Sequence, residues 1–143
     1  MGLKLLHLSL HGLIRSHDLE LGRDADTGGQ TLYVLELVKG LASRPEVEQV
    51  DLLTRLIQDR RVSSDYSQSK EVLSPGSSII RIPFGPKRYL RKELLWPYLD
   101  DLADLLVAQL LKEKRLPDWI HAHYADAGYV ASLVCSRLEI PLV

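Results

Sequence analysis

The chain has 143 residues, 45% of them hydrophobic and 26% charged, and its 18 Lys and Arg against 19 Asp and Glu give a formal net charge of -1. A chain of this length is expected to form one domain that buries roughly two-thirds of its unfolded surface, so its core needs no metal or disulfide. The near-neutral charge excludes a general attraction to nucleic acid or anionic membranes, and any anion binding must be local.

The cysteine count and the hydropathy pattern bear on location. Cys135 is the only cysteine, which excludes an intrachain disulfide and suits a reducing cytoplasm. The apolar run at residues 3–13 is interrupted by polar residues and lacks a cleavage pattern, so it does not resemble a signal peptide. No apolar stretch approaches the length of a membrane span. We expect a cytoplasmic protein with no membrane partner.

The first part of the chain alternates strand and helix patterns. Residues 3–11 predict a short buried strand, because Gly12 and a polar loop follow them. Residues 28–43 predict a helix, and residues 50–55 predict a second strand that runs parallel to the first after this crossover. The apolar face of the helix consists of Val34, Leu37, Val38 and Leu41.

The middle of the chain is less regular. Residues 57–76 contain many serines and no sustained period, which predicts an exposed loop that is either mobile or part of a binding face. Residues 77–84 predict a strand, and Pro83 near its end favours a place near a sheet edge. A basic turn follows at residues 86–90.

The last part of the chain returns to alternation. A helical pattern runs to about residue 114, and Pro97 should occupy a first-turn position that separates a short piece at 91–96 from the main helix. Then come a strand at 118–123, a helix at 126–138 and the start of a strand at 140–143. This order predicts an α/β fold with a Rossmann-like, doubly wound, mostly parallel sheet. Because the chain stops within an apolar run, we expect an incomplete domain.

The loop at residues 22–30, GRDADTGGQ, opens directly into the first predicted helix. A helix N-terminus has unpaired backbone N–H groups and about half a positive charge, and adjacent glycines let a ligand approach the main chain. The loop therefore predicts a site for a phosphate-type anion. The alternative is an ordinary strand-to-helix turn capped by Asp26 or Thr27.

Four motifs carry a family resemblance. GRDADTGGQ, IRIPFG, LRKELLWPYL and IHAHYADAG stand in the order in which they occur in the sucrose-phosphate synthases and their relatives among the retaining GT-B glycosyltransferases, which have two Rossmann-like domains. The resemblance covers nearly the whole chain. It implies that residues 1–143 are the N-terminal, acceptor-side domain, with the second, nucleotide-sugar-binding domain absent from the chain.

The resemblance also implies a reaction. The family transfers glucose from a nucleotide sugar, here UDP-glucose, to fructose 6-phosphate with retention, which gives sucrose 6-phosphate. Its catalytic-region histidine and its donor-binding Arg, Lys and Glu residues have no counterpart in the chain, so the catalytic residues stay unassigned and the chain alone is expected to be inactive. The resemblance implies no cofactor, leaves Mg²⁺ open, and makes a sucrose-phosphate phosphatase a candidate partner.

Other functions remain open at this point. Sucrose synthases share the DTGGQ and WPYL elements, so a sucrose synthase or another sugar-phosphate glycosyltransferase is one alternative. A non-catalytic, Rossmann-like domain that binds a sugar phosphate is another.

The resemblance assigns five residues. Gly28 and Gln30 are expected to contact fructose 6-phosphate, and Gly29 to lie against the donor diphosphate. Lys92 and Tyr124 are expected to hold the acceptor sugar. A compact ammonium with three donors suits a phosphate or a hydroxyl, but a basic turn is usually solvated surface, so Lys92 depends on the resemblance.

Two histidines invite a metal-site interpretation. His121 and His123 end a predicted strand and should share one face of it, with Tyr124 on the other face. A His-x-His pair can bind zinc, but no third ligand stands at a characteristic spacing, so we expect no metal site.

Three further polar residues are interpreted as structural. His7 and His11 are expected to be ordinary strand or loop histidines, and Asp126 is expected to cap the following helix.

Overall fold

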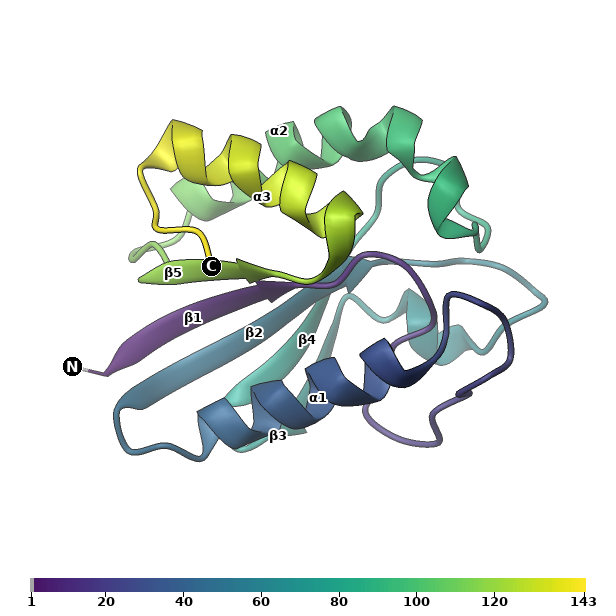
Figure 1. Cartoon of the computed structure of the whole chain (residues 1–143), viewed down its shortest axis with the longest axis horizontal. Coiled ribbons are helices and arrows are strands. Elements are labelled where there is room, and N and C mark those ends of the chain that lie inside the picture. The colour runs from purple at the N-terminus through teal and green to yellow at the C-terminus, as the bar shows by residue number, and fades with distance from the viewer. Residues whose placement is uncertain (1) are drawn as a thin grey trace.

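The computed structural model describes residues 2–143, which form a five-stranded sheet with the order β3-β4-β2-β1-β5 (Figure 1). The strands are β1 (Leu3–Leu8), β2 (Val47–Arg55), β3 (Lys70–Ser74), β4 (Ser77–Ile82) and β5 (Trp119–Ala122). The helices are α1 (Gly29–Ala42), α2 (Leu99–Leu111) and α3 (Tyr124–Leu138), with 3-10 turns η1 (Ser64–Ser67), η2 (Lys92–Leu94) and η3 (Trp96–Tyr98). All neighbouring strands pair in parallel except β3 and β4.

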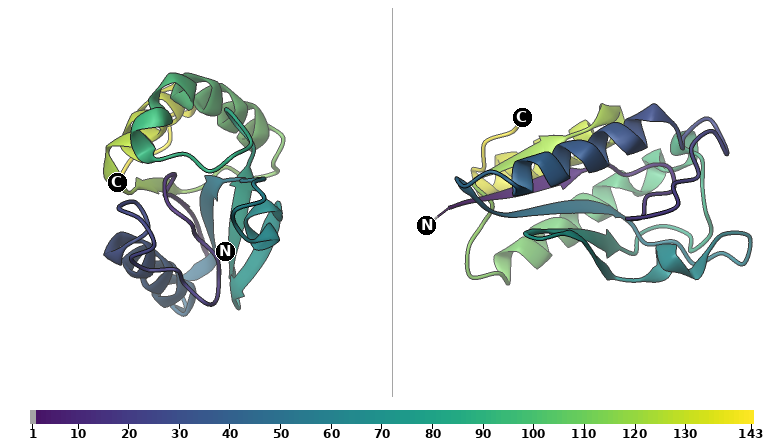
Figure 2. Two further views of the ribbon diagram at one scale, coloured as in Figure 1. Left: turned by 90° about the vertical axis from the view of Figure 1, so that its right-hand side faces the viewer. Right: turned by 90° about the horizontal axis from the view of Figure 1, so that it is seen from below.

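Helices cover both faces of the sheet. In Figure 1, α2 and α3 lie above the sheet and α1 lies below it, and the end-on view in Figure 2 shows the same three layers. This arrangement confirms the α/β prediction with a doubly wound, mostly parallel sheet. None of the helices in residues 2–143 has the length and apolar character needed to cross a bilayer.

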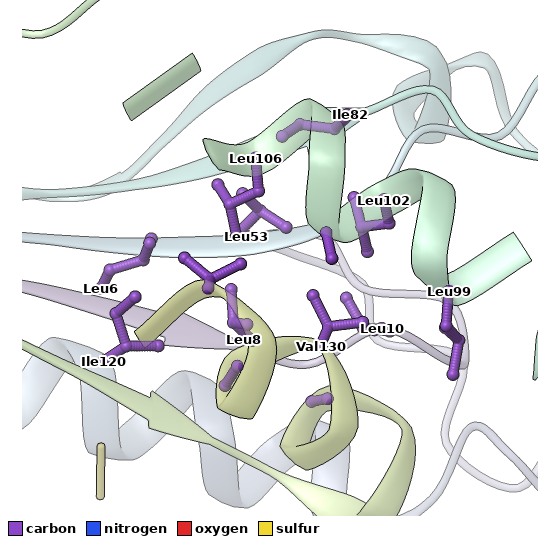
Figure 3. Close-up of a cluster of buried hydrophobic side chains, with 14 of the residues drawn as sticks. Leu6, Leu8, Leu10, Leu53, Ile82, Leu99, Leu102, Leu106, Ile120 and Val130 are labelled. Carbon is purple, nitrogen blue, oxygen red and sulfur yellow. The ribbon is translucent and has the colours of Figure 1, made fainter. Parts of the chain in front are cut away.

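The central strand β1 supplies side chains to both layers. Leu6 and Leu8 pack into the larger core cluster under α2 and α3, where Figure 3 shows Leu6 beside Ile120 of β5 and Leu53 of β2 beside Leu106 of α2. Leu5 packs on the opposite face against α1. Because the strand is buried on both faces, its sequence is a leucine-rich run and does not alternate between apolar and polar residues.

The structure corrects the predictions for the middle of the chain. Residues 57–76 are not wholly a loop, because they contain η1 and β3, and β3 pairs antiparallel with β4. Strand β4 accordingly lies one position in from the edge that β3 forms. The buried side chain of Arg81 holds the edge strand by an ion pair with Glu71 at 2.7 Å. Strand β3 contains polar residues and is held in place by its partner strand, so its sequence lacks the alternation of apolar and polar residues that predicts a strand.

Element ends differ by a few residues from the predictions. Strand β1 ends at Leu8, short of residue 11, and α3 begins at Tyr124, two residues before its predicted start. Pro97 lies in η3 immediately before α2, which confirms the predicted division of that segment. Beyond α3, Leu142 forms a single parallel bridge with Ile120 in place of a strand.

Leu106→Ala should lower the free energy of unfolding by about 2–5 kcal/mol, because it opens a cavity at a side chain that is 0% exposed in the core under α2. The matched control is Leu105→Ala on the same helix, where the side chain is 46% exposed and the expected loss is below about 1 kcal/mol. Urea denaturation measures both variants. Equal losses would contradict the assigned orientation of α2.

Candidate functional site

The candidate site lies at the carboxyl ends of the parallel strands, where several segments leave the sheet together (Figure 1). They are residues 9–28 after β1, 56–63 after β2, 83–98 after β4, and His123 after β5. Open α/β sheets bind ligands at this edge.

The glycine-rich loop, residues 22–30, is anchored at its centre. Thr27 is buried, and its Oγ1 accepts a hydrogen bond from the Leu13 amide at 3.1 Å. The Tyr89 hydroxyl donates to the two carboxylate oxygens of Asp24 at 3.0 and 2.9 Å. Because Tyr89 belongs to the segment after β4, the loop is fixed to two separate parts of the chain.

Gly12 allows the segment after β1 to pass against this loop. Its φ is +84°, and a Cβ at this position would lie 2.3 Å from the backbone oxygen of Asp26. No side chain fits in that space, so the approach of the two backbones requires glycine.

The N-terminus of α1 is open. Gly28 is the N-cap residue, no side chain caps the helix, and its first turn has no acidic residue, so neither Asp26 nor Thr27 acts as the cap. Within residues 2–143, the amides of Gly29 and Gln30 have no backbone partner. A Cβ added to Gly28 or to Gly29 would meet no atom within 4 Å. The positive end of the helix is therefore accessible to an anion.

Lys92 is fastened to the glycine-rich loop through Asp26. Its amide donates to Asp26 Oδ2 at 2.7 Å, and its Nζ donates to Oδ1 at 2.8 Å. Burial alone would raise the pKa of Asp26, but the hydrogen bonds and positive charge of Lys92 outweigh it and hold that pKa below its usual value. Hydrogen bonds to the carboxylates of Asp26 and Glu93 raise the pKa of Lys92. Lys92 is thus a fixed cation.

Tyr124 stands beside Lys92 in an unusual backbone conformation. Its φ is +75°, in the left-handed region that residues other than glycine rarely adopt. Its ring is 53% exposed, lies 6.0 Å from Lys92 Nζ, and meets the His11 ring edge-on at 4.9 Å. Strained residues of this kind gather at ligand sites.

Asp126 supports Tyr124 from behind through His11. The His11 Nδ1 and Asp126 Oδ2 atoms are 2.8 Å apart, and both side chains are buried. The other carboxylate oxygen of Asp126 accepts the Ala127 amide at 2.7 Å. Asp126 does not occupy the predicted cap position, because His123 is the N-cap residue of α3. Its main partner is a histidine distant in sequence.

Three other histidines, His7, His121 and His123, form a separate cluster on the sheet. Burial, followed by the charges of the other two rings, lowers the pKa of His7 from 6.5 to about 3. Burial and His121 lower the pKa of His123 to about 4, and burial lowers that of His121 as well. The cluster is therefore neutral at pH 7.

The structure brings part of the predicted site together. Lys92 and Tyr124 are neighbours, and Asp26 connects Lys92 to the loop that ends in Gly28, Gly29 and Gln30. A pocket of about 310 Å³ opens here between the loop and the segment after β4. It is lined by Asp24, Ala25, Asp26, Tyr89, Arg91, Lys92 and Glu93. A larger pocket, of about 430 Å³, is lined by residues within 57–67 and by none of the five predicted site residues.

The sequence patterns do not identify the residues that hold other site residues in place. They indicate only a helix cap for Asp26 and ordinary strand or loop histidines for His7 and His11. Their partners Lys92, His123 and Asp126 lie 66 to 116 positions away in the chain, so local spacing gives no signal. The order of the elements does indicate the site's location, because neighbouring parallel strands place their carboxyl ends at one edge of the sheet.

Comparison with known proteins agrees with the four sequence motifs. A family model described as the sucrose synthase first GT-B domain matches residues 2–143. The probable sucrose-phosphate synthase 1 of Oryza sativa subsp. indica is 44% identical over 161 residues, which cover 95% of this chain and 15% of that protein. Sucrose-phosphate synthase 1 of Arabidopsis thaliana is 40% identical over 168 residues, which cover 99% of this chain and 16% of that protein.

A solved structure shows the same fold. A sucrose-phosphate synthase from Thermosynechococcus elongatus superposes with a TM-score of 0.74 and is 25% identical, over 98% of this chain and 31% of that one. The chain thus spans about 15–16% of the length of the two plant relatives.

The histidine cluster should make folding stability depend on pH. The unfolded chain protonates His7 near its ordinary pKa of 6.5, whereas the folded chain does so only near 3. The unfolded state therefore binds more protons between these values, and stability that is complete above pH 6.5 is lost as the pH falls toward 3. The expected slope is about 1.4 kcal/mol per pH unit for each such histidine.

Urea denaturation at a series of pH values checks this slope. In His7→Gln, which cannot take up the proton, the slope should be smaller. An unchanged slope would show that His7 titrates normally in the folded chain.

Proposed function

The chain belongs to the family of the sucrose synthase first GT-B domain, and from this membership we propose that it forms the acceptor-side part of a retaining glycosyltransferase. The proposed reaction transfers glucose from UDP-glucose to fructose 6-phosphate and gives sucrose 6-phosphate. The names of the plant and cyanobacterial relatives, all sucrose-phosphate synthases, support this choice. Because the chain covers a small share of those relatives, we propose that a second, nucleotide-sugar-binding domain supplies the rest of the site.

The observation that carries the proposal is the connection between Lys92 and the glycine-rich loop. The Lys92–Asp26 contact at 2.8 Å puts a fixed cation beside the loop that opens into α1. The centroid of the Tyr124 ring lies 6.0 Å from this cation. A sugar phosphate has an anion for Lys92 and hydroxyl groups that Tyr124 can bind, so both groups suit one acceptor.

The open end of α1 suits the donor. As the glycosidic bond to the diphosphate breaks, negative charge builds on the leaving group. Backbone N–H groups aimed at that position stabilise the charge without reorganising. We assign Gly29 to the donor diphosphate, and Gly28 and Gln30 to the acceptor. Holding the two substrates side by side accelerates such a bimolecular step, here by front-face attack without a covalent enzyme intermediate.

We also propose where the reaction takes place and which enzyme uses its product. A cytoplasmic location fits a chain whose only cysteine, Cys135, is a buried free thiol. A sucrose-phosphate phosphatase is the proposed partner, because the proposed product is a phosphate ester.

Two alternatives make different predictions about substrates. A sucrose synthase would accept free fructose in place of fructose 6-phosphate, and steady-state assays with the two acceptors distinguish them. A non-catalytic binding domain would bind the sugar phosphate in calorimetric titration but show no transfer when joined to the remainder of its polypeptide. The fixed cation at Lys92 favours the phosphorylated acceptor.

Lys92→Ala in the full-length enzyme should raise the KM for fructose 6-phosphate at least tenfold and leave the KM for the nucleotide sugar within about twofold, because only the acceptor loses a charge-assisted contact. Initial-rate kinetics with each substrate varied in turn measure both constants. The control is Lys87→Ala, which removes an exposed lysine from the preceding turn. Equal losses for both substrates would remove Lys92 from the acceptor site.

Gly29→Ala should separate activity from stability. A Cβ at Gly29 meets no protein atom within 4 Å, so the free energy of unfolding should stay the same or rise by up to about 1 kcal/mol. The same Cβ would stand where the diphosphate approaches, and kcat/KM for the nucleotide sugar should fall at least tenfold. Gly40→Ala is the control, since Gly40 lies further along the same helix with equal space around it. Normal kinetics in Gly29→Ala would place the donor elsewhere.

A further inference from the structure

Histidines from two neighbouring strands meet on the face of the sheet that α1 covers. The parallel pairing of β1 with β5 puts His7 directly opposite His121, and His123 follows on the same face. The ring centroids of His121 and His123 are 4.3 Å apart, and the His7 ring lies 4.8 and 5.2 Å from them. One ring nitrogen from each histidine lies within 4.8 Å of the other two.

The cluster contains a buried nitrogen without a partner. His7 is 0% exposed, and its Nδ1 atom lies 2.9 Å from His123 Nε2. Within residues 2–143, the Nε2 atom of His7 has no hydrogen-bond partner. Buried polar atoms are nearly always satisfied in native proteins, because an unsatisfied one costs free energy. A histidine with only a packing role would not be expected to leave this atom unpaired.

We propose that His7, His121 and His123 bind a divalent transition-metal ion, with Zn²⁺ as the best match. Three imidazoles supply three neutral nitrogen ligands and leave a fourth position for water or for a ligand. This site is separate from the Lys92–Asp26 contact and does not depend on the proposed glycosyltransferase activity.

The ligand atoms indicate which class of metal ion the cluster would bind. Imidazole nitrogen suits zinc, copper, nickel and iron, whereas magnesium and calcium prefer oxygen ligands. The three-residue set contains no carboxylate. Mg²⁺ and Ca²⁺ are therefore not the expected ions.

Zinc binding requires the side chains of the cluster to rotate. Two nitrogens at about 2.0–2.1 Å from a tetrahedral zinc ion are ~3.3 Å apart. The nitrogens that the three histidines offer lie within 4.8 Å of one another, so the rings must turn to bring them together. If His7 binds the ion through its unpaired Nε2 atom, the 2.9 Å contact between His7 Nδ1 and His123 Nε2 opens. The third ring, that of His121, is partly exposed, whereas His7 and His123 are buried.

The test uses the chain after removal of metal with a chelator. Isothermal titration with Zn²⁺ should show one site with a dissociation constant in the micromolar range or tighter, and Mg²⁺ should show no binding. X-ray absorption of the zinc-loaded chain should show an imidazole ligand shell without sulfur. A sulfur-containing shell, or equal binding of Mg²⁺, would overturn the proposal.

His121→Gln is the informative variant, because this ring is the most exposed of the three and its loss should be tolerated by the fold. It should weaken zinc binding at least tenfold, with circular dichroism and thermal unfolding of the metal-free chain confirming that the fold is retained. His17→Gln is the matched control, since His17 is an exposed histidine outside the cluster and its loss should change affinity less than twofold. Unchanged affinity in His121→Gln, or an equal loss in His17→Gln, would refute the assignment.

Discussion

The arrangement of the site depends on β1, which is paired on both sides and buried on both faces. Backbone hydrogen bonds fix the places where the chain leaves the sheet. The Ser9 amide donates to the Leu53 carbonyl at 3.0 Å, and the His123 amide donates to the Leu8 carbonyl at 2.9 Å. The end of one strand therefore sets both the start of the segment that leads to α1 and the start of α3.

Side-chain contacts join the segments that follow the strands. The glycine-rich loop is connected to the segment after β4 by Asp24 with Tyr89 and by Asp26 with Lys92. The Lys92 ammonium has three donors, and the carboxylates of Asp26 and Glu93 take two of them. The remaining donor can meet a ligand without breaking either contact, so the two ion pairs are compatible with the acceptor-binding role that we propose for Lys92.

The sequence predicted the order of the elements because strands buried on both faces and helices with one apolar face leave strong patterns. It missed β3, whose order comes from pairing with β4 and from the Glu71–Arg81 ion pair. For the site, the motif resemblance named Lys92 and the glycine-rich loop, and the structure joins the two through Asp26. The supporting contact from Asp26 and the meeting of His7 with His121 depend on strand register, which no local spacing encodes.

The left-handed backbone at Tyr124 sets the direction in which its side chain leaves the main chain. The φ angle there is +75°, at the junction of β5 and α3. The same angle is unfavourable for a residue with a side chain and would be relaxed by glycine. Glycine at this position would thus make the folded state more stable, and the strain at Tyr124 is the cost of keeping a side chain that we propose to bind the acceptor.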